Sequence, residues 1–459
     1  MVLVLTMVVL QSISFTNYAL TAKTTNIIQG SAPYLTFDGG RTRVTNTAAL
    51  LGISLSDGRR FTPTTNNSER NPIVLPVVGQ SFADIGMLVP RNTISIGLSS
   101  LIGAPYNYWG DDDGDGQGDN GVTATGSLWI SIVDKNNQAV SRNEVLTICK
   151  APYQLTLSYG SGRLKTRYGV PNESRFTEGN ATYYIKPKGT AAICFARPNL
   201  QYGGGDFAGP ANIWNRDKGF LTKSFTPSSY GSNFPTTGAN NLYFDLDIVG
   251  NNQALSWAPV SHEGITATMS NSTSTSVRVT LTGPVATSYS DNSGRIDKPS
   301  LPQVFELIGR DSHGNAVVKY GFKLQKWFVN RGKGRYDYSS ISSWCNNIGY
   351  RLPEVKDLTN ATCRTGGLWA TGAWGCQGKA ELVGAKPSSP VNGYMRHIGA
   401  GFLSEWGHMA YYTGANFNSH YYLTSDKTND SRYPFFGVSW DMGSANYNIS
   451  EPVGVCVYP

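Results

Sequence analysis

Five aspartates lie in one short loop, and their spacing is the clearest suggestion of chemistry in the sequence. In YNYWGDDDGDGQGDNG, residues 106–121, the pattern D-x-D-x-D-G-x-x-D matches positions 1, 3, 5, 6 and 9 of a calcium loop. Alternate carboxylates in such a loop converge on one cation, and the glycine permits the sharp turn. We therefore predict a Ca²⁺ site whose ligands are Asp111, Asp113, Asp115, the Gln117 carbonyl and Asp119. The alternative is a solvated acidic turn, since Val122 replaces the bidentate glutamate of position 12.

The cysteines indicate an oxidising compartment. The six are Cys149, Cys194, Cys345, Cys363, Cys376 and Cys456, and they allow 15 pairings. Proximity favours Cys149–Cys194 and Cys363–Cys376, which leaves Cys345 and Cys456 as a long-range pair. No CxxC or Cys/His zinc spacing occurs, and disulfide-bonded proteins are typically extracellular.

Length and composition favour several β-rich domains. The chain has 459 residues, which suggests roughly two to four domains. Charged residues make up only 15%, while 40% are hydrophobic, which excludes a disordered chain. The net charge of +7 is spread without a dense Lys/Arg run, so no nucleic-acid partner is expected.

The N-terminus predicts export. An apolar run from Val2 to Leu10 is followed by small residues near Ala19 and Ala22, as in a secretory signal. We assign residues 1–22 to a signal peptide and expect a secreted or cell-surface protein. The alternative is a membrane anchor, but this run is too short to span a bilayer, and no transmembrane segment is expected elsewhere.

The predicted fold class is mainly β with a small α+β C-terminal domain. Residues 23–237 read as a β-rich module that ends in a long Gly/Asn/Pro/Ser-rich connection after about residue 200. Residues 238–325 read as an immunoglobulin-like β-sandwich, because LYFDLDIV and SVRVTLTG alternate with period two and a hairpin turns at 311–315.

Residues 326–459 have a different pattern. Ile341, Trp344, Cys345 and Ile348 form one stripe of an amphipathic helix, with Ser339 or Ser340 as its N-cap and Gly349 after its end. A second, short helix is expected to begin with Pro353 at its first position. The remainder is aromatic, Gly-rich and short-stranded.

The stretch WCNNIGYRLPEVKDL resembles the first helix and turn of C-type lectin-like domains, which read W-C-x-x-x-G-x-R-L-P. The closing VCVYP resembles their last strand, so the resemblance also implies the Cys345–Cys456 disulfide. Immunoglobulin-like modules followed by such a domain resemble the passengers of intimin/invasin-type bacterial adhesins and, by layout, Zir-type secreted exoproteins. The sugar-binding motifs Glu-Pro-Asn, Gln-Pro-Asp and Trp-Asn-Asp are missing, so Ca²⁺-dependent sugar binding is not implied.

This resemblance implies a non-catalytic adhesin connected with virulence. The expected partner is a receptor on a host cell or bacterial surface, protein or glycan, and an intimin-like outer-membrane barrel is an expected translocator. Tyr and Trp are favoured at recognition surfaces, although most aromatics of such a domain lie inside it. The predicted binding surface consists of Trp406, Tyr411, Tyr412, Tyr421, Tyr422 and Trp440.

Two other kinds of site were weighed. His397, His408 and His420, with Glu405 nearby, could supply zinc ligands, but their spacing fits no metal motif. The alternative function is a secreted carbohydrate-active or formylglycine-enzyme-like catalyst, because carboxylate pairs for glycoside hydrolysis are spatial and leave no sequence motif.

Overall fold

The structure, a computed structural model, describes residues 29–114, 116, 121–363, 382–447 and 449–459. It is mainly β, as predicted, and divides into two compact units. The first unit contains the chain up to Leu146 together with Pro152–Lys186, and the second contains Thr147–Ala151 and Pro187–Pro459. The predicted signal peptide, residues 1–22, lies outside the described residues. Among those residues, no helix is both long enough and apolar enough to cross a membrane.

The first unit is built on a five-stranded antiparallel sheet. Its strands, in spatial order, are β4 (Ile73–Val78), β12 (Gly179–Lys188), β9 (Tyr153–Tyr159), β8 (Ser127–Val133) and β5 (Ser95–Gly97). A three-stranded sheet contains β11 (Glu173–Phe176), β10 (Gly162–Thr166) and β7 (Val122–Thr125). The short elements are β1 (Tyr34–Leu35), β6 (Trp109–Gly110), β2 (Ile53–Ser54), β3 (Arg60–Phe61), α1 (Thr47–Leu50), α2 (Leu98–Leu101) and η1 (Phe82–Asp84).

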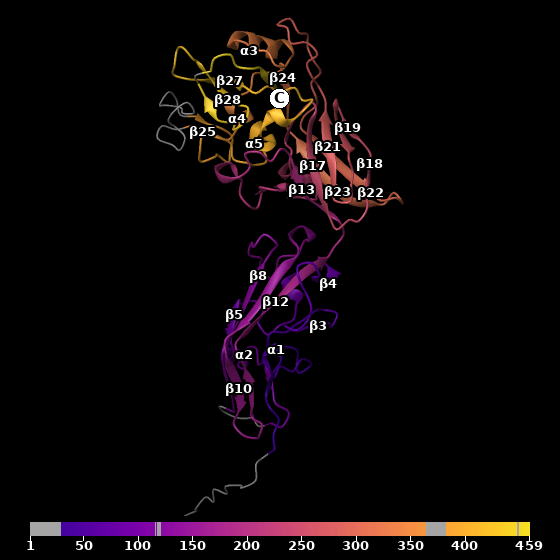
Figure 1. The fold of residues 1–459 in the computed structure, drawn as a ribbon, viewed down its shortest axis with the longest axis vertical. Coiled ribbons are helices and arrows are strands. Elements are labelled where there is room, and N and C mark those ends of the chain that lie inside the picture. The colour runs from indigo at the N-terminus through magenta and orange to yellow at the C-terminus, as the bar shows by residue number, and fades with distance from the viewer. Residues whose placement is uncertain (1–28, 115, 117–120, 364–381, 448) are drawn as a thin grey trace, which may run out of the picture. The chain divides into compact units, whose positions relative to one another are not determined.

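The second unit begins with a two-sheet sandwich (Figure 1). The larger sheet runs in the order β14 (Trp214–Asn215), β15 (Gly219–Leu221), β13 (Ala192–Arg197), β17 (Leu242–Val249), β21 (Ser276–Thr282), β20 (Ile265–Ser270) and β19 (Val260–His262). The smaller sheet contains β18 (Ser256–Trp257), β22 (Gln303–Arg310) and β23 (Ala316–Leu324). Short 3-10 turns are η2 (Ile148–Lys150), η3 (Gly205–Phe207) and η4 (Pro227–Ser232).

Alternating side chains produce the sandwich core. Every second residue of β17 is buried, as the period-two pattern of LYFDLDIV predicts. Phe244 of this strand meets Phe322 of β23 edge to face, with ring centroids 6.0 Å apart. The two sheets therefore bury their apolar faces against each other.

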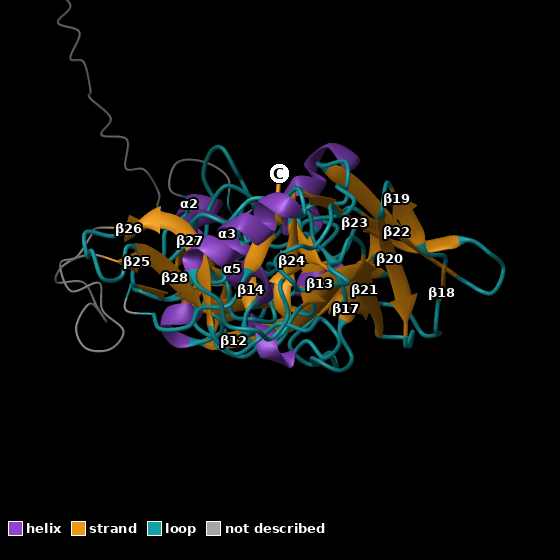
Figure 2. Ribbon diagram, turned by 90° about the horizontal axis from the view of Figure 1, so that it is seen from above, coloured by secondary structure: helices purple, strands orange, loops and turns teal. Residues whose placement is uncertain are grey.

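The C-terminal part of this unit, residues 326–459, which we call the C-terminal domain, adds small sheets and short helices. One sheet contains β16 (Thr237–Ala239), β24 (Lys326–Asn330) and β30 (Val455–Tyr458), and another contains β27 (Tyr421–Lys427), β28 (Phe435–Ser439) and β29 (Ala445–Asn446). The rest are β25 (Thr362–Cys363), β26 (Leu382–Val383), α3 (Tyr338–Asn347), α4 (Val355–Leu358), α5 (Phe402–Trp406) and η5 (Met409–Tyr411). Figure 2 shows these helices among the strands of the domain.

Helix α3 confirms the predicted amphipathic stripe, with different capping. Ile341, Trp344 and Cys345 are buried, and Gly349 follows the helix with φ +89°. The N-cap is Asp337, whose carboxylate accepts the Ser340 N–H at 2.7 Å, so the serines lie inside the helix. Pro353 likewise precedes α4, because Glu354 caps that helix in a reciprocal pair with Asp357.

The structure divides the chain at residue 187, about fifty residues before the predicted boundary at 237. Strand β13 pairs with β17, so it belongs to the sandwich. The predicted connection after residue 200 is also part of the second unit, since Trp214, Tyr230 and Phe234 are buried in it. These aromatic anchors, spaced along a Gly- and Ser-rich segment, hold it against the sandwich core.

Candidate functional site

Only part of the predicted calcium loop is described, because Asp115, Gln117 and Asp119 lie outside the described residues. Asp111 accepts the Gly116 N–H at 2.8 Å, and Asp113 accepts the Ser31 N–H. Asp112 pairs with Arg43, so the loop carries less uncompensated charge than its sequence suggests. A carboxylate has about four lone-pair sites, so such contacts leave capacity for a hard cation. The calcium site stays a prediction.

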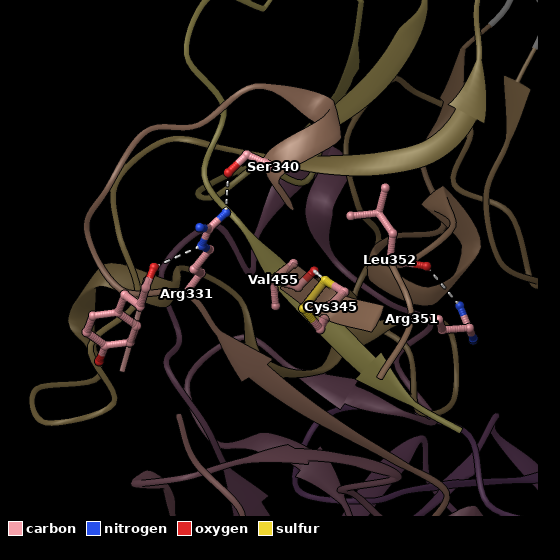
Figure 3. Close-up of a disulfide and its surroundings, with 8 residues drawn as sticks. Arg331, Ser340, Cys345, Arg351, Leu352 and Val455 are labelled. Atoms are coloured by element: carbon pink, nitrogen blue, oxygen red, sulfur yellow. Dashed lines mark hydrogen bonds between the residues drawn. A yellow bond between two sulfur atoms is a disulfide. The ribbon is translucent and has the colours of Figure 1, made fainter. Parts of the chain in front are cut away.

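The disulfides agree with the predicted pairs wherever the structure describes both partners. Cys149 is bonded to Cys194, and Cys345 of α3 is bonded to Cys456 of β30. Figure 3 shows Cys345 beside Val455, whose carbonyl oxygen lies 3.8 Å from the Cys345 sulfur. Cys363 is also disulfide-bonded, and its predicted partner, Cys376, lies outside the described residues.

The predicted aromatic binding surface is wrong for three of its six residues. Trp406, Tyr412 and Tyr422 are 0%, 4% and 1% exposed, so they belong to the core. Trp406 packs edge to face on Phe234 of the sandwich at 4.9 Å. The structure leaves Tyr411 exposed at 49%, and Tyr421 and Trp440 half-buried. Large apolar rings are buried wherever another part of the chain packs over them, because burial removes their surface from water. The sequence does not show which parts of the chain pack over which rings.

The three histidines have separate surroundings. His397 lies 2.8 Å from the Ile398 carbonyl, His408 packs edge to face on Trp440 at 4.3 Å, and His420 lies 2.7 Å from Arg335. Within the described ranges, no group of three or more His, Cys, Asp or Glu side chains is placed to hold a metal ion.

A buried carboxylate attaches the C-terminal domain to the sandwich. Glu405 of α5 is 0% exposed and accepts hydrogen bonds from the N–H and hydroxyl groups of Thr236 and Thr237, at 2.6–3.1 Å. Its fifth donor is the Gly399 N–H at 2.8 Å. Burial raises the pKa of the Glu405 carboxyl above its ordinary value, against the opposite effect of these donors. The carboxylate therefore fixes α5 to the start of β16.

An arginine completes this attachment. Arg396 is fully buried and donates to the backbone carbonyls of Asn199 and Gln201 at 2.7 and 2.8 Å. Its guanidinium also lies 4.7 Å from the centre of the Trp214 ring. Asn199 and Gln201 are thus hydrogen-bonded to the C-terminal domain, and these bonds hold that domain against the sandwich.

A cavity of about 420 Å³ opens on the C-terminal domain. Its wall comes from four segments: the chain entering α3, Leu423 of β27, the turn before β28 and the chain after β29. Its aromatic lining residues are Tyr336, Tyr338, Tyr433, Phe435 and Tyr447. Ligand sites are concave and of roughly 300–1,000 Å³, mostly apolar with a few polar groups, and this cavity has that size and character. We refer to it as the aromatic cavity.

Three aromatic rings of this cavity pack against other side chains. The Arg331 guanidinium lies 3.7 Å from the centre of the Tyr336 ring, and Arg331 is itself buried and donates to Ser340 at 2.8 Å (Figure 3). Tyr338 stacks on Phe435 with centroids 3.5 Å apart and planes within 4°. Because one face of Tyr336, Tyr338 and Phe435 is already covered, these three rings keep fixed orientations before any ligand arrives.

The charges of the cavity wall balance. The lining contains two arginines, Arg335 and Arg432, and two carboxylates, Asp337 and Glu451, so their formal charges cancel. Arg335 forms an ion pair with Glu451. The backbone of Glu451 has a φ of +63°, in the left-handed region that residues other than glycine rarely adopt. Asp337 caps α3, and hydrogen bonds from the Ser340 N–H and the Ser339 hydroxyl lower the pKa of its carboxyl.

Comparisons with protein-family models and with curated proteins found no match. Solved structures of two adhesins are similar. Invasin, a bacterial integrin-binding protein, is 13% identical over 74% of this chain and 52% of its own, with a TM-score of 0.34. This chain therefore spans about half the length of that protein.

Two intimin structures are also similar. The C-terminal 282-residue fragment of intimin, in complex with the intimin-binding domain of the translocated intimin receptor, is 12% identical over 76% of this chain and 90% of its own, with a TM-score of 0.33. Intimin-190 from enteropathogenic E. coli is 15% identical over 52% of this chain and 92% of its own, with a TM-score of 0.26. Sequence identities and TM-scores this low do not establish a family for the chain.

Sequence reasoning missed the residues of the aromatic cavity. They lie in two short stretches, RYDY at 335–338 and RYPFF at 432–436, each with an arginine followed by aromatic residues. The repeated Arg-Tyr pair, directly before a helix in one case and a strand in the other, was the available signal. Loops at the ends of rigid elements are common places for binding residues.

Proposed function

We propose that this chain is a secreted or surface-displayed, non-catalytic adhesin-type protein. Its C-terminal domain would bind a receptor on a host or bacterial surface, and an intimin-like barrel would export it. The observation that carries the proposal is the aromatic cavity, whose rings are held from behind and whose domain is fixed by Glu405, Arg396 and the Cys345–Cys456 disulfide. A preorganised concave surface on a rigid base is what a binding protein needs.

The chemistry of the described residues supports binding over catalysis. The five cysteines of the described part are disulfide-bonded, so they do not offer the reactive thiol pair of formylglycine-generating enzymes. A glycoside hydrolase needs a carboxylic acid with a raised pKa as proton donor. Asp337 has a lowered pKa, and Glu451 is paired with Arg335.

The test is binding of the fluorescently labelled full chain to cultured epithelial cells and to bacterial cells. We expect saturable binding that decreases strongly in the Tyr336→Ala/Tyr433→Ala double variant. Tyr168→Ala serves as the control, because Tyr168 is an exposed tyrosine that neither lines the cavity nor belongs to the predicted binding surface. The proposal is wrong if no saturable binding occurs on either cell type, or if the double variant binds as well as the control.

A further inference from the structure

The aromatic cavity has a lining that selects the chemical class of its ligand. Of its thirteen lining residues five are aromatic, four are charged and four are aliphatic. Two of these four, Leu423 and Pro452, are buried, which leaves the accessible aliphatic surface to Ile449 and Pro434. A site for an apolar side chain or a lipid would need such surface, because burial of aliphatic groups is what binds those ligands.

The balance of charge argues against an ionic ligand. Two arginines and two carboxylates line the wall, and Arg335 is neutralised directly by Glu451. Arg432 is 81% exposed and lies 3.8 Å from Asp430, which reduces its attraction for an anion. A site for a sulfate or carboxylate group would show unpaired cations converging on one point.

The same charged groups suit a ligand rich in hydroxyls. A guanidinium carries five N–H donors and a carboxylate about four acceptor sites, so one ion pair uses only part of the capacity of each. The Arg335–Glu451 pair therefore places donors and acceptors side by side at the wall. Two neighbouring hydroxyl groups, each a donor and an acceptor, match that arrangement.

The aromatic rings supply the complementary surface. The C–H groups on one face of a pyranose ring pack well against a flat aromatic ring. Tyr336 and Tyr433 are half-buried, and Tyr336 has one face occupied by Arg331, so its orientation is fixed. Aromatic rings with paired polar groups beside them meet both the apolar face and the hydroxyl edge of a sugar.

A peptide strand is disfavoured by the sheet at the cavity. Strand addition needs an exposed edge with free backbone groups. Phe435 belongs to β28, which is the central strand of its sheet and is paired on both sides by β27 and β29.

We propose that the aromatic cavity binds the uncharged terminal sugars of a glycan, with Tyr336 and Tyr433 as stacking platforms and the Arg335–Glu451 pair as the hydroxyl-binding group. This inference rests on the proposed function and specifies its receptor as a neutral glycan in place of a protein. It needs no metal ion, because donors and acceptors both come from side chains.

The experiment uses the full chain on an array of neutral oligosaccharides that end in hexose or N-acetylhexosamine, with sialylated and sulfated forms of the same glycans. A positive glycan is then measured by titration calorimetry. We expect binding to neutral glycans that the sialyl or sulfate group does not strengthen. Tyr336→Ala should weaken binding about tenfold or more, a value in the range of interface hot spots.

Two further variants separate binding from folding. Tyr336→Phe keeps the ring and should stay within about threefold of the native affinity, far less than a hot-spot loss. Tyr433→Ala removes a second half-buried ring of the lining and should also weaken binding, while the control Tyr168→Ala should not. Thermal unfolding of each variant checks that it is folded.

The outcomes distinguish the two proposals. Mild periodate oxidation of the target cells should abolish binding of the chain to those cells, because periodate destroys sugar rings with neighbouring hydroxyls. The chain should still bind the purified glycans, which contain no protein. If cell binding survives periodate but is lost after protease, the proposed function holds and the glycan inference is overturned. Preference for sialylated or sulfated glycans, or equal affinity of Tyr336→Ala, would also overturn it.

Discussion

Glu405→Gln should destabilise the second unit strongly, although it changes a single atom type. The side chain keeps its shape, but one acceptor oxygen becomes an NH₂ donor. Every group around the native carboxylate is itself a donor: the Thr236, Thr237 and Gly399 N–H groups and two threonine hydroxyls. The hydroxyls can rotate to accept, whereas the backbone N–H groups cannot.

The magnitude follows from the donors that lose their acceptor. Either orientation of the amide leaves at least one N–H without a partner, either the buried one of Thr237 or that of Gly399, an exposed residue, at a cost of up to about 1–3 kcal/mol. Loss of charge assistance in the remaining hydrogen bonds adds about 1–2 kcal/mol, since bonds to charged groups are stronger than neutral ones. The free energy of unfolding should therefore fall by about 2–5 kcal/mol, which lowers Tm by roughly 5–20 °C in a unit of this size.

The assay is differential scanning calorimetry of the full chain, together with limited proteolysis of the segment around residues 200–240. This segment should be cleaved faster in the variant, because Thr236 and Thr237 lose their anchor. Glu263→Gln is the control, since it makes the same change at an exposed position of the same unit and should stay within about 0.5 kcal/mol. An unchanged Tm for Glu405→Gln would refute the reasoning and would indicate that the native carboxyl is protonated.

Three further predictions concern the other charged and covalent features. Asp357 is buried, which opposes ionisation, but hydrogen bonds from Arg351 at 2.6 Å and Lys326 at 2.5 Å outweigh this and lower its pKa. Asp357→Asn should cost about 3–5 kcal/mol near neutral pH in denaturant titrations. The difference should begin to shrink as pH falls below the ordinary value of 3.8, where the carboxyl of the unfolded chain is protonated, and should be lost below the lowered pKa of the native carboxyl. Cys345→Ser/Cys456→Ser, which opens a cross-link between residues 111 apart, should lower unfolding free energy by about 2–5 kcal/mol, and reductant should then have no further effect at this pair. If the loop of Asp111 and Asp113 binds Ca²⁺, calorimetry should show heat at millimolar Ca²⁺ and a gain of about 2.7 kcal/mol at a hundred times Kd, both lost in Asp113→Ala; no heat and no thermal shift would leave only a solvated turn.

The sequence by itself determined the features that depend on neighbouring residues. Period-two alternation located β17, β21 and the β22–β23 hairpin, because successive strand residues face opposite sides of a sheet. The stripe of α3 is equally local, since residues three and four apart share one helix face. The W-C-x-x-x-G-x-R-L-P motif identified Cys345 and Arg351, and the structure shows that both have structural roles.

Only the tertiary structure decided which aromatic residues are core and which form a surface. Trp406 and Tyr411 have similar sequence surroundings, yet one is buried against Phe234 and the other is exposed. The position of the domain boundary likewise depended on long-range hydrogen bonds. Glu405 and Arg396 bond to residues more than 160 positions away in the sequence, which places those residues in the second unit. The aromatic cavity joins residues 335–338 to lining residues between 423 and 452, and no local period records that these segments meet. Local pattern fixes the conformation of each element, whereas burial and a binding site arise from contacts between elements, which depend on how the whole chain packs.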